Sequence, residues 1–292
     1  MAQPVAGSSL TLVGPGRAGK AFARSWLAAG GRIVEVVART PPDARTAAED
    51  IGAGTPRAVA DAQADTDVLI LAVPDDAVAP AASALAGRFR CRAAFHVSGA
   101  LPAAAMMALR SSGAALGSLH PARVFTGAAS ETWGDTLVAV EGDAAAVAEG
   151  EAIIRAFGGR PRRISAKAKP LYHAAAAIAA GGTAALVSAA TRAWVEAGIP
   201  EDEARPALAA LAGQAAAAAA REGFERAFTG PVARRDLGTI GAHAEALASS
   251  PEVLRLYALL AEETLVRTPG RGLEDEIRRL LSFGLREGGR KS

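Results

Sequence analysis

A glycine-rich turn near the start of the chain constrains its fold more than any other feature of the sequence. The pattern G-x-G-x-x-G spans residues 14–19, directly after the apolar run Leu10–Val13 and at the start of the helical pattern Arg17–Ala29. In dinucleotide-binding folds these glycines allow a tight turn, close approach of the backbone to a pyrophosphate, and close helix–strand packing. The alternative is a glycine turn in an α/β domain that binds no nucleotide. The context favours a cofactor site, and we predict that it includes Gly14, Gly16, Arg17, Ala18 and Gly19.

The residues after the second predicted strand, Ile33–Ala38, indicate which dinucleotide binds. An NAD site usually places Asp or Glu about 20 residues after the glycine turn, where it accepts hydrogen bonds from the ribose. Here Arg39 and Thr40 follow the strand, and a cation and a hydroxyl can both bind a 2′-phosphate. Arg17 can add a second cation, whereas Arg39 can also be an ordinary solvated arginine. The sequence therefore predicts NADP as the cofactor.

Strand and helix signals alternate over the first part of the chain and then give way to helix alone. Apolar runs such as Val68–Val73 are typical of parallel strands that are buried on both faces. From Ala166–Glu196 onwards every pattern is helical, with Ser165 as a plausible N-cap. We therefore predict the α/β class, with a doubly wound Rossmann domain at residues 1–165 and an all-helical domain at residues 166–292.

Composition argues against several classes of protein. Lys plus Arg number 32 and Asp plus Glu number 30, a balance that does not suit a nucleic-acid-binding or membrane-surface protein. The single cysteine, Cys91, cannot form an internal disulfide, and the first nine residues lack the features of a secretory signal. The chain has 4 histidines and no cysteine cluster, so we expect no metal site. We expect a cytoplasmic protein in which the apolar stretch Ala174–Ala190 is a buried helix rather than a membrane span.

The predicted strand ends carry the candidate ligand contacts. Ligands of doubly wound folds bind at the carboxyl ends of the strands, so the backbone of Val73 and Pro74 can lie along the cofactor. Asp75 and Asp76 follow, and they either contribute to the same site or only cap the next helix. His96 lies within an apolar run and is expected to be buried.

Several segments in this order resemble a known bacterial family, which joins a Rossmann-like domain to a C-terminal domain of unknown function. The segments are Leu71–Asp75, His96–Gly99, Ser118–Pro121, Lys169–Ala176 and Thr229–Pro231. That family is similar to pyrroline-5-carboxylate reductase, ketopantoate reductase, prephenate dehydrogenase and the β-hydroxyacid dehydrogenases. The resemblance covers residues 9–250 and implies a helical C-terminal domain of the 6-phosphogluconate dehydrogenase type.

The resemblance also implies roles for particular residues. Ser98 and Gly99 resemble a tight turn beside the nicotinamide. Thr229 lies in a polar region of the helical domain that often reaches the cleft of a partner subunit in related folds, and it is a candidate substrate contact there. Such proteins usually carry Asn where this chain has Gly181, and Gly where it has Arg235. The missing amide puts any substrate contact that depends on Asn in doubt.

One helix face carries the candidate acid/base groups. Lys169, Tyr172 and His173 are spaced i, i+3 and i+4, so they share a face, and Gly181 continues it if the helix is regular. Lys169 or His173 can protonate the oxygen or nitrogen that hydride addition leaves behind, with Tyr172 as a substrate contact. The alternative is that His173 and Tyr172 make interdomain hydrogen bonds and Lys169 is solvated.

The dipeptide His120-Pro121 follows a predicted strand and resembles the His-Pro of prephenate dehydrogenases. His120 is either an acid/base or hydrogen-bond donor to the substrate, or a structural histidine. Arg123, close by in the sequence, can bind a carboxylate. Lys169 is the first choice for the proton source because its long side chain can reach back over the sheet edge.

These observations together predict an NADP-dependent reductase acting on a small ketone or imine that bears a carboxylate. The alternative is a non-catalytic protein that senses NADP(H) or interacts with other proteins, and Gly181 supports it. The sequence also predicts a homodimer through the C-terminal domain, because the helices there are apolar on more faces than a small domain can bury. Examples are Ile178, Leu186, Val187, Trp194 and Val195.

Overall fold

The computed structural model describes residues 5–63, 65–269 and 272–288. Contacts between Cα atoms divide the chain into two units, Met1–Ala177 and Ile178–Ser292. The predicted boundary after residue 165 precedes this division, because helix α5 (Lys169–Ala177) belongs with the sheet. The predicted outer limits, residues 1 and 292, lie outside the described residues.

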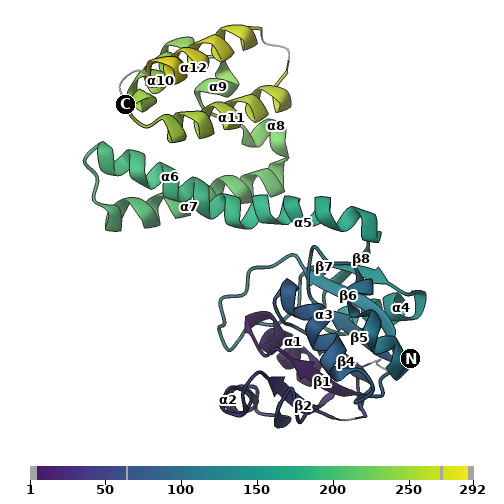
Figure 1. The fold of residues 1–292 in the computed structure, drawn as a ribbon. Coiled ribbons are helices and arrows are strands. Elements are labelled where there is room, and N and C mark those ends of the chain that lie inside the picture. Colours follow the sequence, from purple (N-terminus) through teal and green to yellow (C-terminus); the bar gives the residue numbers. More distant parts are fainter. Residues whose placement is uncertain (1–4, 64, 270–271, 289–292) are drawn as a thin grey trace. The chain divides into compact units, whose positions relative to one another are not determined.

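The first unit is built around one sheet of eight strands in the order β3-β2-β1-β4-β5-β6-β7-β8 (Figure 1). The strands are β1 (Ser9–Val13), β2 (Arg32–Ala38), β3 (Thr55–Ala58), β4 (Val68–Leu71), β5 (Ala93–His96), β6 (Ala115–Pro121), β7 (Leu137–Gly142) and β8 (Arg160–Arg163). The helices of this unit are α1 (Arg17–Ala28), α2 (Pro41–Ile51), α3 (Asp75–Leu85), η1 (Ala103–Ser112), α4 (Ala144–Ala156), η2 (Ala166–Ala168) and α5. The predicted Rossmann architecture is confirmed.

Strand pairing follows the expected parallel pattern with one exception. Strands β6 and β7 are antiparallel, with Ser118 opposite Glu141. No helix lies between these two strands in the sequence. Antiparallel neighbours can be joined without a helix, whereas parallel neighbours need a longer crossover connection. Strand β3 lacks a sequence signal because its residues are largely exposed and carry no apolar run.

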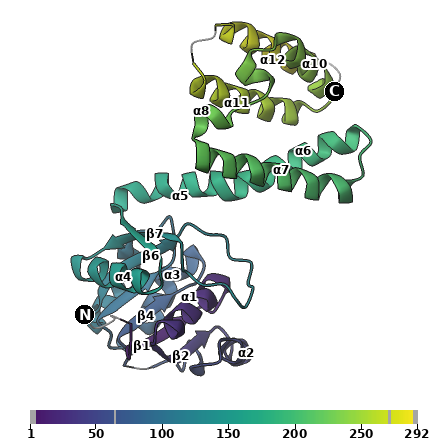
Figure 2. The same ribbon diagram turned by 180° about the vertical axis from the view of Figure 1, so that it is seen from behind.

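Helices cover both faces of the sheet (Figure 2), and two apolar clusters fill the space between these helices and the strands. Phe22 and Trp26 of α1, together with Ile153 of α4, pack on one face of the sheet. Val78 and Leu85 of α3 pack with residues of η1 on the other face. With helices on both faces, the central strands are fully buried, as their continuous apolar sequences predicted.

The second unit is helical throughout its described residues, as predicted. Its helices are η3 (Ile178–Gly182), α6 (Thr183–Glu196), α7 (Glu201–Glu222), α8 (Phe224–Ala227), α9 (Pro231–Arg234), α10 (Leu237–Ala246), η4 (Leu247–Ser249), α11 (Pro251–Arg267) and α12 (Glu274–Gly288). The segment η3 is a π-helical turn, so the helix predicted over Ala166–Glu196 is not regular. Gly181 lies in this turn, and its predicted alignment with His173, which assumed α-helical periodicity, therefore loses its basis.

The helical stretch Ala166–Glu196 is long and apolar enough to cross a membrane by length and composition, with a mean hydropathy of 1.5 in its most apolar window. Only 11% of that window is buried. The expectation of a buried helix is therefore not met within a single chain. Ile178 is 73% exposed and Val195 is 45% exposed, so apolar side chains of this stretch face outward.

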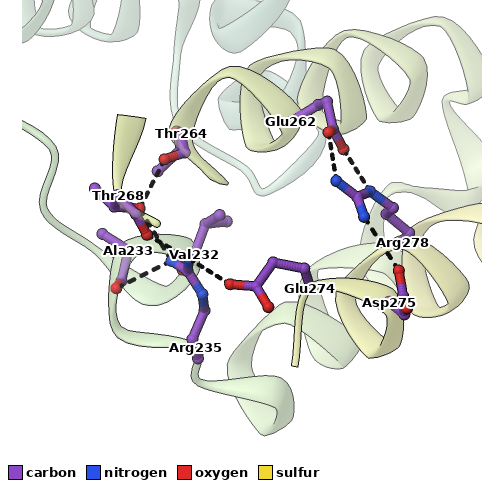
Figure 3. A network of polar contacts seen from close by, with 9 residues as sticks. All are labelled: Val232, Ala233, Arg235, Glu262, Thr264, Thr268, Glu274, Asp275 and Arg278. Carbon is purple, nitrogen blue, oxygen red and sulfur yellow. Dashed lines mark hydrogen bonds and ion pairs between the residues drawn. The ribbon is translucent and has the colours of Figure 1, made fainter. Parts of the chain in front are cut away.

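One buried arginine organises the polar interior of the second unit (Figure 3). Arg235 has a φ of 59°, in the left-handed region, which explains why the resembling family uses Gly at this position. Its Nη1 donates to Val232 O at 3.1 Å and to Thr268 Oγ1 at 3.0 Å, and its Nη2 donates to Glu274 Oε1 at 2.9 Å. Arg235 thereby joins the end of α9 to the end of α11 and the start of α12.

Candidate functional site

The glycine turn after β1 has the geometry that its sequence predicts. Gly14 has a φ of 81°, and a Cβ there would lie 2.5 Å from Val73 Cγ1. A Cβ on Gly19 would lie 2.6 Å from Gly14 O, so this glycine allows α1 to pack closely against the turn. A Cβ on Gly16 would meet nothing within 4 Å, so the backbone of this residue is open to a ligand. The turn therefore fits a pyrophosphate at the start of α1.

A cavity of about 870 Å³ extends from this turn along the ends of β1, β2 and β4. Its lining includes Gly14, Gly16, Arg39, Val73 and Pro74, all predicted to contact the cofactor. Its position at the carboxyl ends of parallel strands is the usual ligand position in a doubly wound sheet. The cavity and the open glycine backbone together fit an extended dinucleotide.

Two of the predicted cofactor contacts are engaged elsewhere. The Thr40 hydroxyl caps α2, accepting from Asp43 N at 3.3 Å and donating to Asp43 Oδ2 at 2.7 Å. Arg17 Nη1 lies 3.5 Å from Phe125 O. Arg39 is thus the predicted cation that lines the cavity.

A row of buried polar side chains crosses three neighbouring strands of the sheet. His96 on β5 is in register with Ser118 on β6, which is in register with Glu141 on β7. Glu141, at one end of the row, contacts the start of η1, because Ala103 N donates to Glu141 Oε2 at 2.8 Å. The strand register brings together three residues that lie far apart in the sequence.

His96 is fully buried, as predicted, and its ring has one defined tautomer. Ser98 N donates to His96 Nδ1 at 3.1 Å, so Nε2 carries the proton and donates to Pro102 O at 3.1 Å. Burial lowers the pKa of His96 to about 4. This histidine is therefore neutral and fixes the Ser98–Gly99 turn.

Lys169 lies at the start of α5, and its side chain extends to this row of polar residues. Its Nζ donates to Ser118 Oγ at 2.7 Å and to Ser98 O at 3.0 Å. The residue is 0% exposed, so the alternative of a solvated lysine is wrong. Burial lowers the pKa of Lys169 to about 8, although the negative charges of Glu141 and Asp75 oppose this shift.

Beside Lys169, the helix face also places Tyr172 and His173 against His120. Tyr172 Oη lies 3.0 Å from His120 Nδ1, and the rings of His120 and His173 meet edge to face at 5.5 Å. Burial, followed by the His173 and Lys169 charges, lowers the pKa of His120 to about 4. Burial raises the pKa of Tyr172. Both groups are therefore neutral near pH 7 and can act as hydrogen-bond donors.

Gly99 makes the close approach of the two histidines possible. A Cβ at this position would meet His173 Nδ1 and would come within 2.8 Å of His120 Nε2. His173 Nδ1 is buried and has no hydrogen-bond partner among the residues that the structure describes. A larger residue at position 99 would therefore displace one or both rings.

The structure brings together most of the residues that the sequence singled out for chemistry. Ser98, Gly99, His120, Lys169, Tyr172 and His173 form one contiguous group at the carboxyl ends of β5 and β6. Arg123 is not part of this hydrogen-bonded group, because its Nη1 donates to Gly134 O at 3.3 Å and its guanidinium lies over Phe125. Thr229 is exposed and lies in the second unit.

Two residues that adjoin this group had no functional signal in the sequence. Ser118 and Glu141 are joined by a hydrogen bond in which Ser118 Oγ donates to Glu141 Oε2 at 3.2 Å. Ser118 lies in a segment that carries the family resemblance, but its partner depends on an antiparallel pairing that the sequence did not predict. Glu141 within an otherwise apolar strand is the only hint that the sequence offers.

Comparison with known families agrees with this architecture. A family model described as "NADP oxidoreductase coenzyme F420-dependent" matches residues 9–91. A second, described as "Domain of unknown function (DUF2520)", matches residues 136–264. No curated protein sequence matches the chain.

Solved structures resemble the chain over most of its length, at identities that show the fold alone. A Bacteroides fragilis protein, provisionally described as an NADP oxidoreductase, is 23% identical, with 89% of this chain and 98% of that chain covered and a TM-score of 0.71. The 1-pyrroline-5-carboxylate reductase of Streptococcus pyogenes is 13% identical, with 97% and 99% covered and a TM-score of 0.61. A reductive aminase from Aspergillus terreus, in complex with NADPH and ethyl-5-oxohexanoate, is 21% identical, with 95% and 99% covered and a TM-score of 0.59. The chain therefore carries a match to an NADP oxidoreductase domain followed by a match to a DUF2520 domain, the order of domains that its motifs predicted.

Proposed function

We propose that the protein reduces a small ketone or imine that bears a carboxylate, with NADPH as the hydride donor. The observation that carries the proposal is the buried Lys169 ammonium at the carboxyl ends of β5 and β6, in a sheet whose glycine turn fits a dinucleotide. Similar folds that bind NADPH or reduce a cyclic imine agree with this chemistry. NADPH consumption with keto acids and cyclic imines tests it.

The cofactor would be held by the glycine turn and by the residues that line the adjoining cavity. Gly16 would present open backbone to the pyrophosphate, next to the tight turn at Gly14. Arg39 would pair with the 2′-phosphate, and Val73 and Pro74 would border the rest of the cofactor. When bound, the nicotinamide supplies the hydride. The protein must then orient the substrate and supply a proton.

Lys169 is the proposed proton source. An ammonium has three N–H groups, and Ser98 O and Ser118 Oγ take two of them, which leaves the third for the substrate heteroatom. A lysine pKa of about 8 leaves the group protonated at neutral pH while making it a better acid than a solvated lysine. The same positive charge attracts a substrate carboxylate.

The neutral groups beside Lys169 would orient the substrate. His120 and Tyr172 share a hydrogen bond, and Tyr172 Oη also lies 3.3 Å from His120 O. A histidine with a pKa of about 4 does not compete with Lys169 as an acid at neutral pH. We therefore assign His120 and Tyr172 to hydrogen bonding with the substrate, with His173 packed against them.

Arg39 determines the proposed preference for NADPH. We expect the parent protein to bind NADPH at least about tenfold more tightly than NADH, equivalent to about 1.4 kcal/mol. Arg39→Asp removes the cation and places a carboxylate near the ribose, so this preference should disappear or invert. The dissociation constants are measured by fluorescence titration of both reduced dinucleotides.

Arg45→Asp is the matched control, because Arg45 is an exposed arginine on α2 outside the cavity lining. It makes the same change of charge and should leave the preference intact. Equal affinities of the parent for NADPH and NADH would contradict the cofactor assignment.

We also propose that two copies associate through η3, α6 and α7 of the second unit. Ile178, Val195 and Leu211 are 73%, 45% and 56% exposed, and a helix that is apolar on most faces requires a partner surface. In a symmetric dimer, the same surface of each copy would pack against the other copy and cover these side chains. We expect light scattering at micromolar concentration to give twice the mass of one chain.

A charge within the proposed interface should separate the two copies. Val195→Glu is expected to shift the mass to that of a single chain. Leu259→Glu, at a 71% exposed leucine on α11, makes the same change outside these helices and should leave the dimer intact. A parent protein with the mass of one chain would count against the dimer.

A further inference from the structure

A fully buried proton donor needs a route by which its proton is replaced. Lys169 and Ser118 are both 0% exposed, so neither exchanges protons with water directly. The replacement proton must then arrive from behind, through groups that are hydrogen-bonded to the amine.

The structure contains one such connection within its described residues. Lys169 Nζ donates to Ser118 Oγ at 2.7 Å, and Ser118 Oγ donates to Glu141 Oε2 at 3.2 Å. Glu141 is 8% exposed, which makes it the most exposed of the three residues. The other bond of Lys169 goes to the backbone carbonyl of Ser98, which has no proton to pass on.

We infer that Ser118 and Glu141 form the path by which Lys169 regains a proton and the counter-charge that keeps it protonated. This inference rests on the proposed reduction, in which Lys169 gives a proton to the substrate. Glu141 takes a proton from water; the Ser118 hydroxyl then gives its proton to the Lys169 amine as it takes the proton of Glu141. One N–H bond forms at Nζ, and the carboxylate and hydroxyl return to their starting states.

The surrounding charges are consistent with this assignment. Glu141 on β7 and Asp75 at the start of α3 both raise the pKa of Lys169, whereas His96 on β5 and His120 on β6 remain neutral near pH 7. Glu141 is the carboxylate hydrogen-bonded, through Ser118, to the amine. Removal of its charge should therefore act directly on Lys169.

The test measures Lys169 by NMR in the cofactor-free full-length protein, which requires no substrate. The lysines of the chain are Lys20, Lys167, Lys169 and Lys291, so Lys169→Met identifies its signal by loss. Glu141→Gln should lower the pKa of Lys169 by about one unit or more, because a neutral amide no longer stabilises the ammonium. At pH values that give parent and variant the same fraction of protonated Lys169, exchange of its ammonium protons with water should be slower in the variant by about tenfold or more.

Variants of Ser118 separate a proton path from a merely structural contact. Ser118→Ala should slow the same exchange, and Ser118→Thr should restore it, because threonine keeps the hydroxyl. Glu49→Gln, which removes an exposed carboxylate on α2, should change neither quantity. Unchanged pKa and exchange in both Glu141→Gln and Ser118→Ala would overturn the inference, whatever the activity.

Activity supplies an independent readout. In a parent protein that turns over a substrate, the alkaline limb of the kcat profile should move to lower pH in Glu141→Gln, in step with the pKa of Lys169. An alkaline limb that stays fixed while the pKa moves would also overturn the path. Absence of turnover in the parent would contradict the proposed reduction but not the proton path. The NMR measurements need no turnover, so they test the proton path separately.

Discussion

Replacing Lys169 with methionine is expected to lower kcat by about 100-fold or more, near 2.7 kcal/mol of transition-state stabilisation. Methionine nearly keeps the volume of the buried side chain but removes the ammonium that donates to Ser98 O and Ser118 Oγ. Hydride addition leaves an anionic oxygen or a nitrogen that needs a proton, and a held cation stabilises it as it forms. NADPH affinity should change less than about threefold, because the glycine turn and Arg39 are untouched.

Lys167→Met is the matched control, since Lys167 is an exposed lysine of η2, in the turn before α5. It should leave kcat and cofactor affinity at the parental values. His120→Asn should give a smaller loss than Lys169→Met, seen partly in KM, because His120 is assigned to substrate binding. Parental turnover in Lys169→Met would remove Lys169 from the mechanism and make His173 or His120 the leading candidate.

The largest effect on stability is expected at Arg235. Arg235→Met should lower the free energy of unfolding of the second unit by about 3 kcal/mol. The substitution removes a guanidinium whose side chain is 3% exposed and leaves the carbonyl of Thr268, which it contacts at 2.5 Å, without this donor. Hydrogen exchange of full-length protein should show lost protection in α11 and α12, which Arg235 joins to α9.

Two further variants separate the side-chain contacts from the backbone conformation. Arg235→Gly loses the same hydrogen bonds but relieves about 1 kcal/mol of left-handed strain, so it should destabilise less than Arg235→Met. Arg234→Met changes the exposed neighbour and should stay within about 0.5 kcal/mol of the parent. An Arg235→Met protein as stable as Arg234→Met would show that the network does not hold the helices together.

Local patterns predicted those parts of the site that depend on local structure. The spacing of Gly14, Gly16 and Gly19 anticipates three different environments, and the structure contains all three. The i, i+3, i+4 spacing placed Lys169 and Tyr172 on one face, and both reach the strand ends. Each of these predictions depended only on the spacing of residues in one short segment and on the strands next to it.

The sequence did not predict features that depend on long-range pairing. The contact between Ser118 and Glu141 follows from the antiparallel register of β6 and β7, which no local pattern specifies. Arg123 is close to His120 in the sequence, yet the connection after β6 directs it to Gly134.

The proposed catalytic group also distinguishes the two functions that the sequence left open. A protein that only senses NADP(H) needs the glycine turn but not a buried ammonium, whose burial carries a free-energy cost. This chain retains Lys169 with a hydroxyl and a carboxylate behind it. Gly181, which supported the sensor, is exposed, and open space surrounds the position of its missing side chain. The polar group around Lys169 therefore favours the enzyme.

The most direct test of the proposed function follows NADPH consumption by the parent protein and Lys169→Met in parallel, with keto acids and cyclic imines as substrates. The parent should oxidise NADPH with at least one carboxylate-bearing substrate, and Lys169→Met should lose that turnover while still binding NADPH. Tight NADPH binding by the parent without turnover of any substrate in the panel would contradict the reductase and favour a non-catalytic sensor.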